Sequence, residues 1–122
     1  MAKGKPAQTV PLECVFFRTK SGTEPVRDWL KDDLSKGARQ QIGADIKTVQ
    51  ATWPIGPPLV KSLGRGLWEV RSTYKTVEYR TIFVFDGGKM VLLHGFQKST
   101  QKTPASVLTL ALARKAEMEM SR

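Results

Sequence analysis

The chain has 122 residues, enough for one compact domain, and its 20 lysines and arginines against 11 acidic residues give a formal net charge of +9. Such a charge favours polyanionic partners, among them nucleic acid, an acidic protein or an anionic membrane surface. The single cysteine, Cys14, excludes an intramolecular disulfide and a cysteine-based zinc site, and no segment approaches the roughly 20 apolar residues of a membrane span.

The N-terminal part of the chain is expected to be a flexible arm followed by one domain. Residues 1–11 are basic and polar, contain two prolines, and are not followed by an apolar stretch long enough for a signal peptide. We therefore expect a cytoplasmic protein without a membrane segment, in which residues 12–122 form a single domain. A short apolar run rich in Val and Phe predicts the first strand at residues 12–18.

Two helices are predicted next. Residues 23–25 are typical of a helix start, with a threonine as cap, an acid in the first turn and a proline that is tolerated there. Apolar residues at helical spacing continue to Leu34, and after a break near Gly37 a second apolar stripe runs up to Pro54. Two antiparallel helices joined by a short turn, a helical hairpin, are the simplest way to pack them.

The second half of the chain changes to a strand pattern. Runs of β-forming residues alternate with glycine turns at residues 64–66 and 86–88. The expected strands are residues 59–63, 67–71, 78–85 and 89–96. After a polar segment, Pro104 opens a final helix that continues to about Met118.

This order of elements predicts the fold class. Separate runs of helix and strand are typical of an α+β fold, in which helices pack on one face of a mostly antiparallel sheet of about five strands. The expected architecture is this sheet with an N-terminal helical hairpin and a C-terminal helix.

The strand region is rich in cations, and one of them lies inside an apolar strand. The cations of this region are Arg65, Arg71, Lys75, Arg80, Lys89, Lys98 and Lys102. Arg80 is the strongest candidate for a functional cation, because its strand also contains the apolar residues Ile82 and Val84. Burying its charge would cost desolvation free energy unless it has a partner or reaches a solvated surface. A salt bridge to Glu69 or Glu78 is the structural alternative.

No cluster of metal ligands or nucleophiles is recognised in the sequence. There is a single histidine, a single cysteine and no pair of acids at metal-ligand spacing, so we expect no metal site and no cofactor. His94 would suit a general base, since its reference pKa lies near neutrality. Its position at the end of an interior strand more often indicates a hydrogen-bonded structural histidine.

Five stretches of sequence carry a resemblance to a known family. They are PVRDWL at residues 25–30, LGRGLWEVR at 63–71, YRTI at 79–82, VLLHGFQK at 91–98 and TQKTP at 100–104. In this order and spacing they resemble the RelE/ParE toxin superfamily and, within it, the HigB-like, phage-derived branch. The resemblance covers residues 24–115, and the RelE-like element order agrees with the order expected from periodicity.

The resemblance implies a toxin that a partner antitoxin neutralises. Many relatives cleave messenger RNA without a metal, commonly at the ribosome, by promoting attack of a ribose hydroxyl on the adjacent phosphate. Fixed cations suit this chemistry because they stabilise the charge that builds on the phosphate. Family cationic positions fall on Arg71, Arg80 and Lys98 as catalytic residues, with Arg65 and Lys102 as contacts to the RNA backbone.

The chain departs from many potent relatives at positions that concern activity. It has Glu69 where they have lysine, Ser99 where a second basic residue is common, and no Tyr, Trp or His after Phe96. The general base is therefore left without an assigned residue. Two alternatives to an RNA endonuclease stay open, namely a ParE-like inhibitor that acts on DNA gyrase through protein contacts, and a phage-derived binding module without toxicity.

Overall fold

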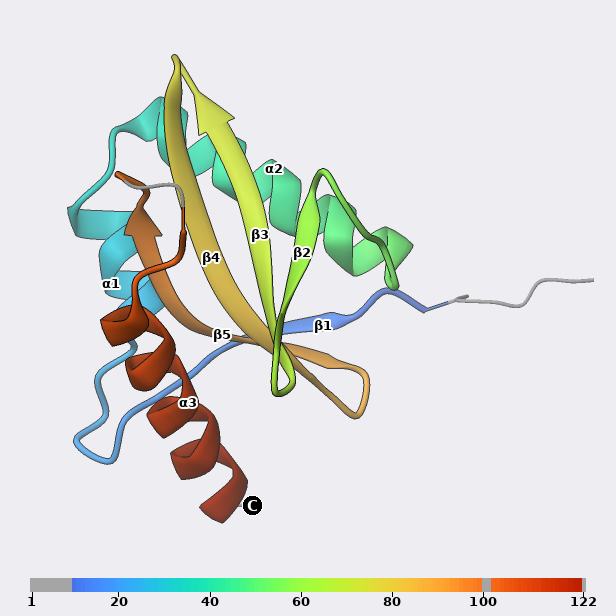
Figure 1. The fold of residues 1–122 in the computed structure, drawn as a ribbon, viewed down its shortest axis with the longest axis vertical. Coiled ribbons are helices and arrows are strands. Elements are labelled where there is room, and N and C mark those ends of the chain that lie inside the picture. Colours follow the sequence, from blue (N-terminus) through green and yellow to red (C-terminus); the bar gives the residue numbers. More distant parts are fainter. Residues whose placement is uncertain (1–9, 100–101, 122) are drawn as a thin grey trace, which may run out of the picture.

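The elements follow one another in the order expected from the sequence. A computed structural model describes residues 10–99 and 102–121, so most of the expected N-terminal arm lies outside the described residues. The elements are β1 (Glu13–Phe16), α1 (Pro25–Asp32), α2 (Lys36–Thr52), β2 (Val60–Gly64), β3 (Leu67–Tyr74), β4 (Val77–Asp86), β5 (Lys89–Gln97) and α3 (Ala105–Met120) (Figure 1). The predicted α+β class is confirmed.

The five strands form one sheet with the order β1-β5-β4-β3-β2. β1 pairs with β5 in parallel and the other three pairs are antiparallel, so the expected mostly antiparallel sheet is confirmed. β4 is the middle strand, and its residues 79–84 are all buried. This position places Arg80 in the part of the sheet that is best shielded from water.

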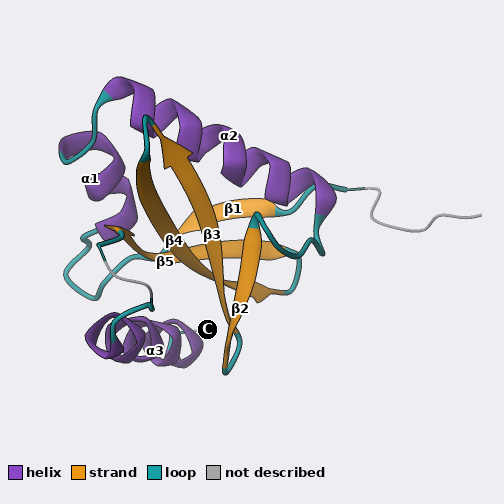
Figure 2. Cartoon of the chain, turned by 45° about the horizontal axis from the view of Figure 1, so that its top comes forward, coloured by secondary structure: helices purple, strands orange, loops and turns teal. Residues whose placement is uncertain are grey.

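Helices cover both faces of the sheet, whereas the sequence analysis expected them on one face. α1 and α2 share a core with Phe83 and Leu92, and α3 shares a second core with Ile82 and Leu93 on the opposite face (Figure 2). The reason is that β4 and β5 direct apolar side chains to both faces, so one layer of helices would leave half of them in water.

No helix within the described ranges is long and apolar enough to cross a membrane.

α1 and α2 follow one another over the same face and do not form the expected helical hairpin. α1 lies against β5, and α2 lies against β3 (Figure 2). Ser35 caps the start of α2, where its Oγ accepts a hydrogen bond from the backbone N–H of Ala38 at 3.2 Å. Val26 of α1 and Ile42 of α2 are both fully buried. Each helix therefore buries its apolar stripe against the sheet and not against the other helix.

A close approach between α1 and β5 fixes the end of β5. Gly95 leaves room for the indole ring of Trp29, because a Cβ at this position would collide with that ring. The same indole also lies 6.4 Å from the ring of Tyr79, measured between centroids. α1 thus holds the last part of β5 in place, and that part leads directly to Lys98.

Candidate functional site

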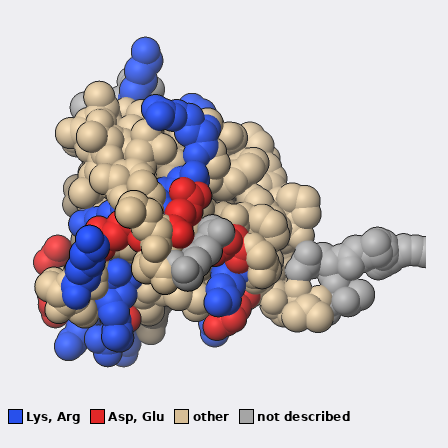
Figure 3. All heavy atoms as spheres, turned by 90° about the horizontal axis from the view of Figure 1, so that it is seen from below, with Lys and Arg blue, Asp and Glu red and all other residues tan. Residues whose placement is uncertain are grey.

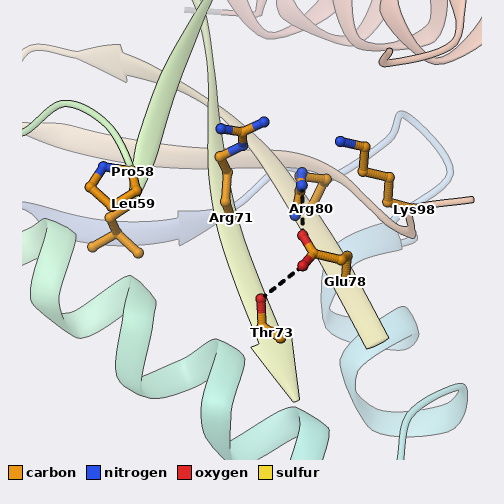
Figure 4. Close-up of a pocket in the computed structure, with 7 residues that line it drawn as sticks. All are labelled: Pro58, Leu59, Arg71, Thr73, Glu78, Arg80 and Lys98. Carbon is orange, nitrogen blue, oxygen red and sulfur yellow. Dashed lines mark hydrogen bonds and ion pairs between the residues drawn. The ribbon is translucent and has the colours of Figure 1, made fainter. Parts of the chain in front are cut away.

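A cleft of about 480 Å³ lies where β3, β4 and the residues after β5 meet (Figure 4). It lies on the face of the sheet that α3 covers, because Arg71 and Arg80 alternate with residues that face the other core. We call it the basic cleft, and its lining residues are Pro58, Leu59, Arg71, Thr73, Glu78, Arg80 and Lys98. The structure therefore brings together the three cations that the resemblance singled out as catalytic.

The register of the strands explains how these residues meet. Arg71 of β3 is directly opposite Arg80 of β4, and Thr73 is opposite Glu78. Lys98 follows β5 and is tied to β4, since its backbone N–H donates to the carbonyl of Glu78 at 2.8 Å. Like charges directly opposite each other destabilise a sheet, so the arginine pair needs neighbouring carboxylates.

Arg80 is held by partners on three sides. Its Nη2 donates to Glu78 Oε1 at 2.9 Å, its Nη1 donates to the carbonyl of Tyr79 at 3.0 Å, and its Nε lies 3.6 Å from Glu69 Oε1. The side chain is only 4% exposed. The expected structural alternative, a salt bridge to Glu69 or Glu78, is confirmed for both acids. Arg80 therefore has a fixed orientation and little freedom to reach for a ligand.

Arg71 and Lys98 are the accessible cations of the basic cleft. The Arg71 side chain is 31% exposed, and its Nε lies 3.9 Å from Glu69 Oε1 without a hydrogen bond to any described residue. Lys98 is half-buried. In Figure 4 the charged ends of both side chains extend to the same side of the sheet, next to Arg80. Three cations arranged in this way suit an anion with several oxygens, such as a phosphate.

Glu69 links this site to the start of α3. The residue is 2% exposed, and its Oε2 accepts a hydrogen bond from the Thr103 hydroxyl at 2.7 Å. A buried carboxylate is stable only when it is paired and hydrogen-bonded, and Glu69 has Arg80 on one oxygen and Thr103 on the other. Sequence reasoning missed the role of Thr103, because no local pattern connects it with a residue 34 positions away.

Glu78 is the accessible acid of the basic cleft, with a side chain that is 47% exposed. Its Oε1 binds Arg80, and its Oε2 accepts a hydrogen bond from the Thr73 hydroxyl at 3.2 Å. The hydrogen bond from Arg80, followed by that from Thr73, lowers the pKa of Glu78 below its usual value, and Lys98 adds a further favourable charge. Glu78 is therefore an anion at neutral pH. Sequence analysis considered this residue only as an ion-pair partner.

Comparison with known families shows the family of the chain. Residues 28–116, well over half of the chain, match a family model described as phage derived protein Gp49-like (DUF891). The chain belongs to the Gp49-like family. This is a family of RelE/HigB-like toxin type, which agrees with the resemblance seen in the sequence and implies an antitoxin partner. Among curated proteins, none shows a match to this chain.

His94 of this Gp49-like protein lies next to a residue that the sequence analysis did not consider. Arg114 of α3 places its Nη1 at 3.3 Å from His94 Nδ1 and at 2.8 Å from the carbonyl of Leu93. Burial lowers the pKa of His94, and the positive charge of Arg114 lowers it further. Because arginine can only donate, Nδ1 accepts and the proton of the neutral ring is on Nε2. This favours the structural interpretation of His94 over a general base.

Arg65 and Lys102, the expected contacts to RNA, do not line the basic cleft. Arg65 occupies the turn between β2 and β3 with a φ of 57°. Lys102 is exposed and directly precedes Thr103.

Figure 3 shows basic side chains in several groups with acidic ones between them, not one unbroken basic surface. The described residues also contain no group of three or more His, Cys, Asp or Glu side chains that could hold a metal ion.

Proposed function

We propose that this protein is the toxin of a toxin–antitoxin pair and that it inhibits translation by cleaving messenger RNA, free or on the ribosome. The observation that carries the proposal is the basic cleft, in which Arg71 and Lys98 extend beside the fixed guanidinium of Arg80. Glu69 and Glu78 offset part of the repulsion among the three cations, and the charged ends of Arg71 and Lys98 remain available to an anionic ligand. The toxin-type family supports the toxin part of this proposal.

The geometry fits the electrostatic part of RNA cleavage. When a ribose 2′-hydroxyl attacks the adjacent phosphate, negative charge builds on the phosphate oxygens, and donors fixed in advance stabilise this charge without reorganising. Arg71 and Lys98 are exposed enough to contact those oxygens. The buried guanidinium of Arg80 adds a further positive charge next to them. In this proposal Arg65 and Lys102 contact phosphates further along the strand.

The antitoxin in this proposal inhibits by covering the basic cleft or α3. Its chemistry should be acidic or amphipathic, since the toxin carries a formal net charge of +9. Binding of this kind would compete with RNA for the same cations. The complex should therefore be stable on co-purification and inactive on RNA.

The test is expression of the protein in cells with and without the product of the neighbouring gene, followed by mapping of RNA ends. Growth arrest with new RNA ends is expected for the wild type, and Arg71→Ala and Lys98→Ala should lose both. Lys47→Ala is the matched control, because Lys47 is an exposed cation of α2 on the opposite face of the sheet. Arrest without RNA cleavage would contradict the proposal and favour an inhibitor of gyrase type.

A further inference from the structure

We propose that Glu78 is the general base of this reaction and that it takes the proton of the ribose 2′-hydroxyl. The inference rests on the proposed function and adds the missing catalytic group to it. It also restricts the substrate class to RNA, because DNA has no 2′-hydroxyl for Glu78 to activate.

Glu78 has the position and the free electron pairs that this role needs. Its side chain is 47% exposed and lines the basic cleft together with Arg71 and Lys98. Each carboxylate oxygen has two acceptor sites, and among the described residues Arg80 uses one on Oε1 and Thr73 uses one on Oε2. The carboxylate is thus held in place by two hydrogen bonds, and acceptor sites remain for a substrate hydroxyl.

The other polar groups near the cleft are less suited to accept a proton. Arg71, Arg80 and Lys98 are cations, and the Thr73 hydroxyl already donates to Glu78. The oxygens of Glu69 are buried and face Arg80 and Thr103, so a substrate has no access to them.

His94 is also excluded from this role while it keeps its contact with Arg114. Its Nδ1 faces the Arg114 guanidinium, and its Nε2 carries the proton of the neutral ring. Among the described residues that line the cleft, Glu78 is therefore the side chain that combines an accessible lone pair with a negative charge.

The charges around Glu78 hold it as an anion beside the cations that would bind the phosphate. Arg71 and Thr73 face it from β3, Arg80 lies beside it on β4, and Lys98 follows β5. These groups keep the carboxylate ionised at neutral pH, and because they lower its pKa, its value as a base comes from its fixed position at the cleft and not from high basicity. The same cations would bind the phosphate that the activated hydroxyl attacks, so base and electrophile share one electrostatic site.

The proton and electron count of the step is simple. Glu78 accepts the 2′-hydroxyl proton while the 2′-oxygen forms a bond to phosphorus, and the bond between phosphorus and the 5′-oxygen breaks. The leaving 5′-oxygen takes a proton from the Lys98 ammonium. Afterwards Glu78 gives its proton to water and Lys98 takes one from water, so both groups return to their starting states and no net proton is consumed. The products are a 2′,3′-cyclic phosphate and a 5′-hydroxyl, and no oxidant, reductant or further reactant is consumed.

The test compares Glu78→Gln with wild type on an RNA that the wild type cleaves, under single-turnover conditions. Glutamine keeps the size of the side chain and can still accept from Arg80 and donate to Thr73, but it cannot take up the proton. We expect the cleavage rate to fall by about 10²–10⁴-fold, the usual contribution of a general base. RNA affinity should stay the same or rise, because one negative charge is removed from the cleft. Glu13→Gln, an exposed carboxylate on β1 at the edge of the sheet, should leave both quantities unchanged.

The opposite results would overturn the inference. If Glu78→Gln cleaves as fast as wild type or faster, Glu78 only competes with the substrate phosphate for Arg80. Glu78→Asp provides the second variant, because it keeps the charge and should retain a measurable part of the rate in a folded protein. Loss of RNA affinity at an unchanged maximal rate in both variants would also contradict the role of a base. If the proposed function itself is wrong, the wild type does not cleave RNA at all, and this result distinguishes the two failures.

Discussion

Glu69 and Arg80 form an ion pair across β3 and β4 that is almost closed to solvent, with side chains 3% and 4% exposed and a distance of 3.6 Å between Oε1 and Nε. The pair offsets the repulsion between Arg80 and Arg71, which occupy directly opposite register positions. Arg80 thus has a structural role in addition to any contact with a ligand. Substitution of Arg80 therefore changes the stability of the protein as well as its contact with a ligand.

We expect Arg80→Met to destabilise the protein by about 3–5 kcal/mol, because it leaves the buried Glu69 carboxylate without its closest cation. The double variant Glu69→Met/Arg80→Met should recover most of this loss, since a buried ion pair can be replaced by apolar residues at little cost. Urea denaturation of the three proteins measures both effects. A double variant as unstable as Arg80→Met would show that Glu69 is not the reason for the loss.

Lys98→Ala and Lys102→Ala should affect RNA cleavage in different ways. Lys98 lines the basic cleft and is the proposed proton donor to the leaving oxygen, so its loss should reduce the maximal rate by at least roughly a hundredfold. Lys102→Ala should mainly weaken binding and reduce the slope of log affinity against log salt by about one. Rates at saturating protein and binding titrations at several salt concentrations separate the two. The assignment fails if both substitutions change the same quantity.

The stability of the protein should depend on pH through His94, the single histidine of the chain. Burial and the charge of Arg114 lower the pKa of His94 in the folded state below its usual value of 6.5. As the pH falls below this value, the unfolded chain binds the proton first, so the wild type loses stability and regains it as the pH rises. Denaturation at pH 7.5 and pH 5 should show a smaller difference for His94→Gln than for wild type. An equal difference would mean that His94 is not shielded by α3.

Gly95→Ala should destabilise the protein by about 1–3 kcal/mol, because the added Cβ collides with the indole of Trp29 and overpacks the contact between α1 and β5. Thermal unfolding measures this loss. Combining Gly95→Ala with Trp29→Leu should cost less than the sum of the two single substitutions. Strict additivity would indicate that the two residues do not restrict each other.

The sequence predicts the elements of this fold better than their packing. Apolar periodicity and glycine turns located all eight elements found in the described residues, because helix and strand repeats are local properties of the chain. The side on which a helix packs depends on the whole sheet, and for this reason the position of α3 opposite α1 and α2 was not predicted. The missing hairpin has the same origin, since Val26 and Ile42 each find a buried site against the sheet.

The candidate site was also predicted only in part. The family pattern identified Arg71, Arg80 and Lys98, which the strand register then brings into one cleft. The family pattern did not reveal two contacts with the sheet. One is the hydrogen bond from Thr103, just before α3, to Glu69, and the other is the contact of Arg114 in α3 with His94. Both join residues at least 20 positions apart, a distance at which local spacing carries no information.

The most direct test of the basic cleft as the site of RNA cleavage is a single-turnover assay with purified protein and a defined RNA, supplied both free and bound to ribosomes. We expect the double variant Arg71→Ala/Lys98→Ala to remain folded but to lose at least about 100-fold in rate, on the scale of one lost electrostatic donor or more. Lys47→Ala should cleave at the wild-type rate, because Lys47 is on the far face of the sheet. The products should carry 2′,3′-cyclic phosphate and 5′-hydroxyl ends. Cleavage by the folded double variant at the wild-type rate, or no cleavage by the wild type of either form of the RNA, would contradict RNA cleavage at the basic cleft.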